Sequence, residues 1–142
     1  MSSAYDQNNI FAKILRSEIP AHRVWESETI LAFLDVMPQA DGHTLIVPKA
    51  ASRNLLDADP SVFPDLMRAA QIIARASLKA FAADGCTLMQ FNEQAAGQTV
   101  FHLHFHVIPR HDGIPLRPHS GTMEKPEVLA ANAEKLRRAL SQ

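Results

Sequence analysis

Residues 98–108 read Gln-Thr-Val-Phe-His-Leu-His-Phe-His-Val-Ile. Three histidines alternate here with four apolar residues: His102, His104 and His106 with Phe101, Leu103, Phe105 and Val107. A period of two residues is typical of a β-strand with one apolar face. The pattern therefore predicts a strand on which all three imidazole rings point the same way.

Three imidazoles on one strand face allow three interpretations. The first is a plain polar face toward water, although threonine or lysine would serve there and histidine is costly to bury without partners. The second is a metal site, because neutral imidazole is the commonest metal ligand. In the third, one ring is a nucleophile, and its neighbours orient it and handle protons near neutral pH.

The rest of the chain mixes strand-like and helix-like patterns. Strands are expected at residues 23–26, 29–34, 44–47 and 87–91, with Pro109 ending the histidine strand. Apolar residues at steps of three and four predict a long helix from Asp59-Pro60-Ser61 to Asp84-Gly85. Further helices are expected over residues 10–19, ended by Pro20, and over residues 126–140. The loop 92–97 makes the last two strands antiparallel neighbours.

Composition narrows the class of protein. A chain of 142 residues with 46% apolar and 20% charged residues suits one globular domain with a real core. A net charge of -1 and no basic run argue against sustained nucleic-acid binding. No apolar run approaches the ~20 residues that span a bilayer, and the polar N-terminus lacks a signal-peptide core, so we expect a cytoplasmic protein with no membrane partner. The single cysteine, Cys86, is expected to be a small packing residue.

Several other motifs accompany the histidines. Gly97-Gln98-Thr99-Val100 precedes the triad, and four more segments occur upstream: Ile10-Phe11-x-Lys13-Ile14, Glu18-Ile19-Pro20, Leu31-Ala32-Phe33-x-Asp35 and Gly42-His43-Thr44-Leu45-Ile46-Val47-Pro48-Lys49. Together they resemble the histidine-triad (HIT) family of nucleotide hydrolases and transferases. The resemblance implies an α+β, HIT-like fold, with a five-stranded antiparallel sheet, one long helix, a short N-terminal helix and a C-terminal helix. It implies a single domain over residues 1–142, with a motif-bearing core at about 8–110 and a C-terminal extension at about 111–142.

The resemblance also assigns roles to residues. His104 is implied to be the nucleophile, His106 to contact the phosphate and the leaving-group side, and His102 and His43 to orient them through hydrogen bonds. The phosphate-binding positions are Asn92, Gly97, Gln98 and Thr99, which offer backbone amides, carboxamides and a hydroxyl. The nucleoside-binding positions are Asp35, Val36, Phe33, Ile10, Phe11 and Ile14, with Asp35 able to accept hydrogen bonds from both ribose hydroxyls. His22, His111 and His119 lie outside these motifs and are expected on surfaces or loops.

Three features set this sequence apart from groups of relatives. The zinc ligands of those relatives, a Cys-x-x-Cys pair and a histidine, correspond here to Asn9, Ala12 and Ala51, so we expect no metal and no cofactor. The third triad position is His106, where the sugar-nucleotide transferases of the family have glutamine, and this favours hydrolysis. The segment after Arg110 also diverges from the small phosphoramidase-like branch, which leaves the choice of substrate open.

The expected activity is metal-independent hydrolysis of nucleoside phosphoramidates or related adenylylated compounds at the α-phosphate. A covalent nucleotidyl-histidine divides the reaction into two easier steps. By resemblance the substrate is a purine nucleotide and the protein is a homodimer. The alternative is a non-catalytic nucleotide- or metal-binding module that uses the same histidine face.

Overall fold

The computed structural model of the protein describes residues 4–118 and 122–142. His119 therefore lies outside the described residues. The elements, in chain order, are α1 (Ile10–Leu15), β1 (Arg23–Glu26), β2 (Ile30–Leu34), β3 (Thr44–Pro48), the 3-10 turn η1 (Pro60–Val62), α2 (Phe63–Ala80), β4 (Gly85–Met89), the 3-10 turn η2 (Gln94–Ala96), β5 (Phe105–Arg110) and α3 (Pro126–Leu140). This is the expected α+β fold.

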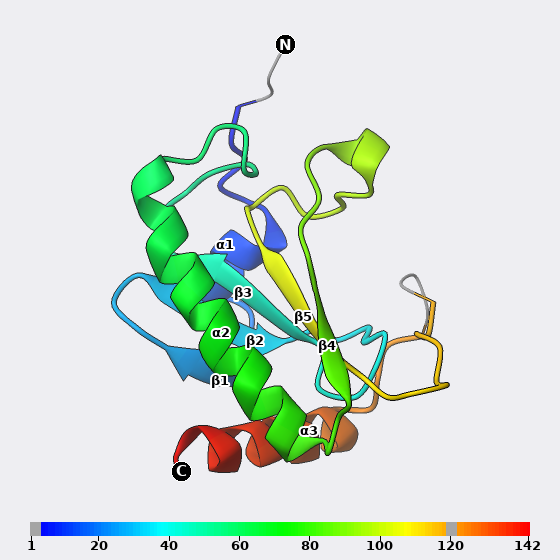
Figure 1. The fold of residues 1–142 in the computed structure, drawn as a ribbon. Helices are drawn as coiled ribbons and strands as arrows, with labels where there is room; N and C mark the ends of the chain where they lie inside the picture. Colours follow the sequence, from blue (N-terminus) through cyan, green and yellow to red (C-terminus); the bar gives the residue numbers. More distant parts are fainter. Residues whose placement is uncertain (1–3, 119–121) are drawn as a thin grey trace.

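The five strands form one antiparallel sheet in the order β1-β2-β3-β5-β4. The long helix α2 crosses one face of the sheet, α3 packs beside it, and α1 lies on the opposite face (Figure 1). Alternate residues of β2 enter two separate cores, because successive side chains of a strand point to opposite faces. Ile30 and Ala32 join the core under α2 and α3, while Leu31 and Phe33 join the core under α1.

α1 and α3 begin where expected, whereas α2 begins at Phe63, after the 3-10 turn η1 that occupies the expected start; α1 and α2 also end early. α3 matches the expected range, and Asp59 caps the turn before α2 by accepting a hydrogen bond from the Ser61 amide at 3.0 Å. α2 stops at Ala80 rather than at Asp84-Gly85, since Ala82 already takes a positive φ of 49°. α1 stops at Leu15, and Ser17 has a φ of 62°, so backbone reversal ends this helix before Pro20 does.

The histidine strand is shorter than expected. β5 pairs with β3 from Phe105 onward, so residues 98–104 precede the ladder and only His106 of the triad lies on the strand itself. The strand continues through Pro109, contrary to expectation. Proline has no amide hydrogen to donate to a neighbouring strand. Pairing of β5 with β3 ends at Val107, so Pro109 lies beyond the part of β5 that pairs with β3. β4 also begins two residues earlier than expected, at Gly85.

The prediction for the single cysteine is wrong. Cys86 is exposed on β4 and does not pack in a core, because β4 is an edge strand that leaves alternate side chains uncovered. His22 is half-buried, and His111 is half-buried with Nε2 placed 3.0 Å from the Phe81 carbonyl oxygen, so neither enters the triad.

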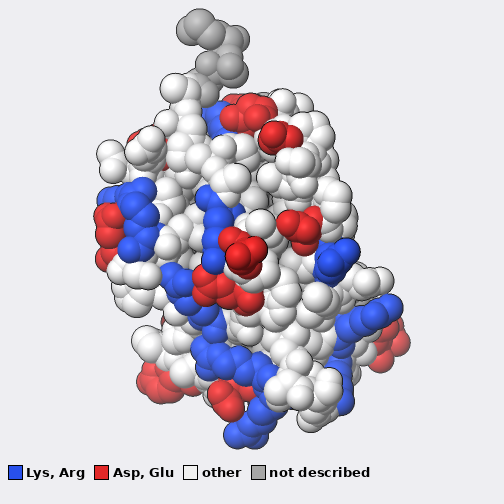
Figure 2. Space-filling view, turned by 90° about the vertical axis from the view of Figure 1, so that its left-hand side faces the viewer, with Lys and Arg blue, Asp and Glu red and all other residues white. Residues whose placement is uncertain are grey.

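Charge on the surface is mixed. On the face drawn in Figure 2, acidic side chains lie beside the basic ones. Lys49, for example, contacts Glu26 at 2.7 Å. Among the described residues, no helix is both long enough and apolar enough to cross a bilayer.

Candidate active site

A cavity of about 340 Å³ opens beside β5 on the α1 side of the sheet. His104 and His106 line it together, as do all the residues expected to bind a nucleoside: Ile10, Phe11, Ile14, Phe33, Asp35 and Val36. Thr99 and Met123 complete the wall from distant parts of the chain. The cavity is mostly apolar with a polar end at the histidines, which is the usual character of a small-molecule site. A larger cavity of about 540 Å³, beside Asp84 and Arg110, contains no triad residue.

His104 has a defined tautomer. Its Nδ1 lies 2.7 Å from the His102 carbonyl oxygen, and a carbonyl can only accept, so Nδ1 carries the proton. The lone pair of the ring is therefore on Nε2. The Phe11 ring meets His104 edge-on at 4.9 Å between centroids, and the imidazole is 8% exposed. Packing and hydrogen bonding together fix the direction of this ring.

His102 faces away from the other two histidines. Its Nε2 donates to the Pro48 carbonyl at 2.8 Å, and its Nδ1 lies 2.6 Å from the Tyr5 hydroxyl. Burial lowers the pKa of His102, and the hydrogen bond to Pro48 opposes that shift only in part. The neutral ring is consistent with an Nδ1 that accepts. The expectation that three rings share one direction is thus correct only for His104 and His106, whose centroids are 5.0 Å apart.

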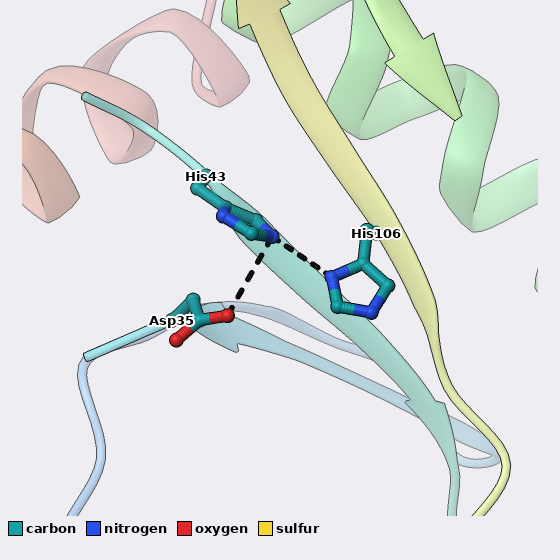
Figure 3. Close-up of side chains that lie close together, drawn as sticks. All are labelled: Asp35, His43 and His106. Carbon is teal, nitrogen blue, oxygen red and sulfur yellow. Dashed lines mark hydrogen bonds and ion pairs between the residues drawn. The ribbon is translucent and has the colours of Figure 1, made fainter. Parts of the chain in front are cut away.

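His43 and His106 form a directed pair. The Gln39 amide donates to His43 Nδ1 at 3.1 Å, so the proton of neutral His43 is on Nε2. That Nε2 lies 2.9 Å from His106 Nδ1 and 3.6 Å from Asp35 Oδ2 (Figure 3). Because Nδ1 of His106 accepts from His43, the proton of His106 is on Nε2. The cavity therefore contains a ring with a lone pair, His104, beside a ring that donates, His106.

The same three side chains are a possible metal set. One ligand atom each from Asp35, His43 and His106 lies within 4.8 Å of the others, and two imidazoles with one carboxylate are common ligands. A metal-bound histidine normally donates its second N–H to an acceptor. Here the second nitrogen of His43 instead faces the N–H of Gln39, so ligation through Nε2 would require an imidazolate or the loss of that bond. The donor set fits a hydrogen-bonded chain better than a cation.

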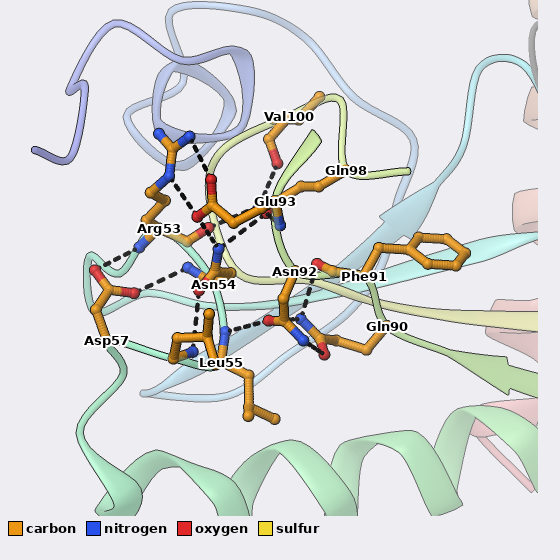
Figure 4. Close-up of polar contacts among 11 residues, drawn as sticks. Arg53, Asn54, Leu55, Asp57, Gln90, Phe91, Asn92, Glu93, Gln98 and Val100 are labelled. Carbon is orange, nitrogen blue, oxygen red and sulfur yellow. Dashed lines mark hydrogen bonds and ion pairs between the residues drawn. The ribbon is translucent and has the colours of Figure 1, made fainter. Parts of the chain in front are cut away.

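A hydrogen-bonded network of side chains shapes the loop that precedes the triad. Arg53 binds both carboxylate oxygens of Glu93 at 2.8 and 2.9 Å, and Asn54 donates to the same carboxylate at 2.7 Å (Figure 4). Gln98, 2% exposed, accepts from the Glu93 amide and from Asn54, and donates to the carbonyls of Arg53 and Val100. These bonds hold Glu93 at a φ of 75°, which is unusual for a residue other than glycine.

The structure brings together some of the expected phosphate-binding residues and not others. Thr99 lines the cavity, whereas Gln98 uses its carboxamide inside the loop. Asn92 accepts from the Leu55 amide at 2.9 Å and exchanges hydrogen bonds with Gln90. Gly97 has a φ of 101°, a conformation that favours glycine. The roles of these four residues toward phosphate stay predictions.

The positions of the zinc ligands in relatives hold other groups here. Asn9 caps α1 by accepting from the Ala12 amide at 2.9 Å, and its side-chain Nδ2 donates to the Asp6 carbonyl at 2.8 Å. Ala12 is buried and Ala51 is exposed. This corner is therefore organised by a helix cap and apolar packing.

Comparison with known proteins decides the family. A family model described as the HIT domain matches residues 16–113. The chain belongs to the HIT family. The HIT chain is 41% identical over 103 residues to "Adenosine 5'-monophosphoramidase HNT1" of Saccharomyces cerevisiae, a match that spans 72% of this chain and 63% of that protein.

Solved HIT structures share the fold. A Hit-like protein from Bartonella henselae, described as involved in cell-cycle regulation, has a TM-score of 0.93 and 56% identity, covering 96% of this chain and 99% of that one. A zinc-bound histidine triad family protein from Mycobacterium smegmatis has a TM-score of 0.85 and 35% identity, covering 96% and 95% of the two chains. Both likenesses extend beyond the matched domain toward the ends of the HIT chain.

Four contributors to this HIT site gave no signal in the sequence. Tyr5 contacts His102, the Gln39 amide contacts His43, Met123 lines the cavity, and Arg53 binds Glu93 in the loop before the triad. None of them lies in a motif or a periodic pattern. Only the fold brings them near residues 98–108.

Proposed function

We propose that the protein is a nucleotide hydrolase that cleaves nucleoside phosphoramidates or related adenylylated compounds through a covalent intermediate on His104. Membership of the HIT family and the name of the yeast relative support the general class of nucleotide hydrolase. The observation that carries the finer proposal is the bond from His104 Nδ1 to the His102 carbonyl, which puts the reactive lone pair on Nε2 in the cavity.

The geometry suits attack on phosphorus. His104 Nε2 forms a bond to the α-phosphorus as the bond to the leaving group breaks, and water later hydrolyses the nucleotidyl-histidine to release the nucleotide. Positive charge develops on the His104 ring during attack, and the His102 carbonyl at 2.7 Å stabilises it. His106 Nε2–H donates to the phosphoryl oxygens, where negative charge accumulates.

The remaining residues are assigned to binding. The apolar walls formed by Ile10, Phe11, Ile14, Phe33 and Val36 receive a purine, and Asp35 at the polar end binds the ribose hydroxyls. Thr99, which lines the cavity, is assigned to the phosphate, and Asn92, Gly97 and Gln98 shape the loop that presents it. His43 holds His106 in its donating tautomer.

A turnover assay with metal removal tests this proposal. Purified, untagged protein should release AMP from adenosine phosphoramidate, and dialysis against EDTA should leave kcat/KM unchanged, because no step uses a metal ion. Elemental analysis of the dialysed protein is the control. Absence of turnover with adenylyl and guanylyl phosphoramidates and with acyl-adenylates would favour a non-catalytic nucleotide-binding module. A stoichiometric metal whose removal abolishes turnover would contradict the metal-free mechanism.

We also propose that the protein forms a homodimer through β4 and α2. β4 is an edge of the sheet, and such an edge offers unpaired backbone groups to another chain. Leu88 on β4 is 48% exposed and Met67 on α2 is 42% exposed. We place the single domain of residues 1–142 in the cytoplasm.

The dimer has a direct test. Sedimentation at micromolar concentration should give a dimer, and Leu88→Glu should shift the protein to monomer because a charge would be buried at the interface. Ile114→Glu is the matched control, since Ile114 is 62% exposed but lies outside β4 and α2. A monomeric wild-type protein would contradict the proposal.

A further inference from the structure

The nucleophile lies on a segment that the sheet does not hold. Pairing between β3 and β5 begins at Phe105, so His102 and His104 come before the first ladder position. The Leu103 amide donates to the Ser52 carbonyl at 2.9 Å, and the side chain of His102 reaches the Pro48 carbonyl at 2.8 Å. The Leu103 amide belongs to the same planar peptide group as the His102 carbonyl. The direction of that carbonyl, which accepts from His104, is therefore set by the bond to Ser52 together with the contacts of the His102 side chain.

One of those contacts comes from the N-terminal segment. The Tyr5 hydroxyl is 2.6 Å from His102 Nδ1, and the two rings meet edge-on at 5.6 Å between centroids. Since His102 Nε2 donates to a carbonyl, Nδ1 of the neutral ring can only accept, so the tyrosine donates. The imidazole of His102 is thus held between the Pro48 carbonyl of β3 and the Tyr5 hydroxyl, and His102 is fully buried.

The N-terminal segment is built to hold this position. Just after Tyr5, Asp6 accepts from the Asn8 amide at 2.8 Å and its carbonyl accepts from the Asn9 amide at 3.1 Å, and Asn9 then caps α1. Two residues after Asn9, Phe11 packs against His104. The same short segment thus contacts two members of the triad, one through a hydroxyl and one through a ring edge.

We propose that Tyr5 is a positioning residue for the nucleophile, acting through His102 to hold the carbonyl that orients His104. The inference rests on the proposed function for its kinetic consequence, but not for its structural one. Tyr5 touches neither the cavity nor the reacting atoms, so its effect is confined to the tautomer and direction of the two rings. Binding of the nucleotide depends on other residues.

Tyr5→Phe tests the proposal, because it removes the hydroxyl and keeps the ring. We expect kcat for AMP release to fall about tenfold with KM nearly unchanged, since a donor to a buried acceptor is lost and the attacking ring is less well aligned. Thr29→Val is the matched control. It removes another side-chain hydroxyl hydrogen bond, that of Thr29 to Asp65 at 2.8 Å, on an exposed surface away from the triad.

Imidazole ¹⁵N spectra supply a second measurement that needs no turnover. Wild-type protein should show His102 as the Nε2–H tautomer and His104 as the Nδ1–H tautomer, and Tyr5→Phe should shift both sets of signals while Thr29→Val shifts neither. Unchanged spectra in Tyr5→Phe, or an equal loss of kcat in Thr29→Val, would overturn the inference. If the wild-type protein shows no turnover, the proposed function fails and the spectra still decide the role of Tyr5.

Discussion

Replacing His104 with alanine should lower the rate of AMP release from adenosine phosphoramidate by about 10⁴-fold or more, because no covalent route remains without the nucleophile. The ring is the only described side chain that combines a position in the cavity with a lone pair directed by a main-chain carbonyl, through the 2.7 Å contact to His102. Single-turnover and steady-state assays should both show the loss. Nucleotide binding should persist, since the apolar walls are untouched.

His22→Ala is the matched control for this change. His22 is half-buried and does not line the cavity, so the same substitution there should leave kcat/KM within about twofold of wild type. Thermal melting of both variants excludes a general loss of folding. If His104→Ala retained more than about a tenth of wild-type activity, attack by this ring would not be the main route.

Gly42→Ala should destabilise the fold by about 2–4 kcal/mol, from backbone strain together with a steric overlap. Gly42 has a φ of +87°, and an added Cβ would lie 2.3 Å from the Phe81 ring, which packs at the end of α2. The loop before β3 therefore approaches the helix as closely as a glycine allows. His43 follows Gly42 directly. The close approach of this loop to Phe81 therefore also sets the position from which His43 reaches His106.

The glycine at 113 separates the two causes. Gly113 has a φ of +76° and nothing within 4 Å of an added Cβ, so Gly113→Ala should cost only the backbone part, about 1 kcal/mol. Thermal denaturation should then show a fall in Tm on the order of 10 °C for Gly42→Ala and a clearly smaller one for Gly113→Ala. Equal shifts would mean that the overlap with Phe81 is relieved at no cost.

Periodicity predicted most of the fold because both sheet faces are buried. The alternation of Leu103, Phe105 and Val107 places these residues in the core under α2 whether or not the backbone is in the ladder. For the same reason, the pattern did not reveal that pairing begins only at Phe105. Element ends differed where a positive φ, as at Ser17 and Ala82, ended a helix without glycine or proline.

The candidate site was predictable only in part. The family motifs identified His43, His104 and His106, and the structure gathers them around one cavity or next to it. His102 was expected beside them, but its side chain is turned toward Pro48 and Tyr5. Main-chain donors such as the Gln39 amide have no sequence signature, since every residue except proline has one.

The Gln39 amide has a consequence for which substrates react fastest. With that N–H against His43 Nδ1, the neutral His43–His106 pair presents the Nε2–H of His106 as a hydrogen-bond donor to developing charge. Among leaving groups that depart without a proton, rates should fall steeply as basicity rises, and the protein then selects by chemistry at phosphorus as well as by the shape of its cavity.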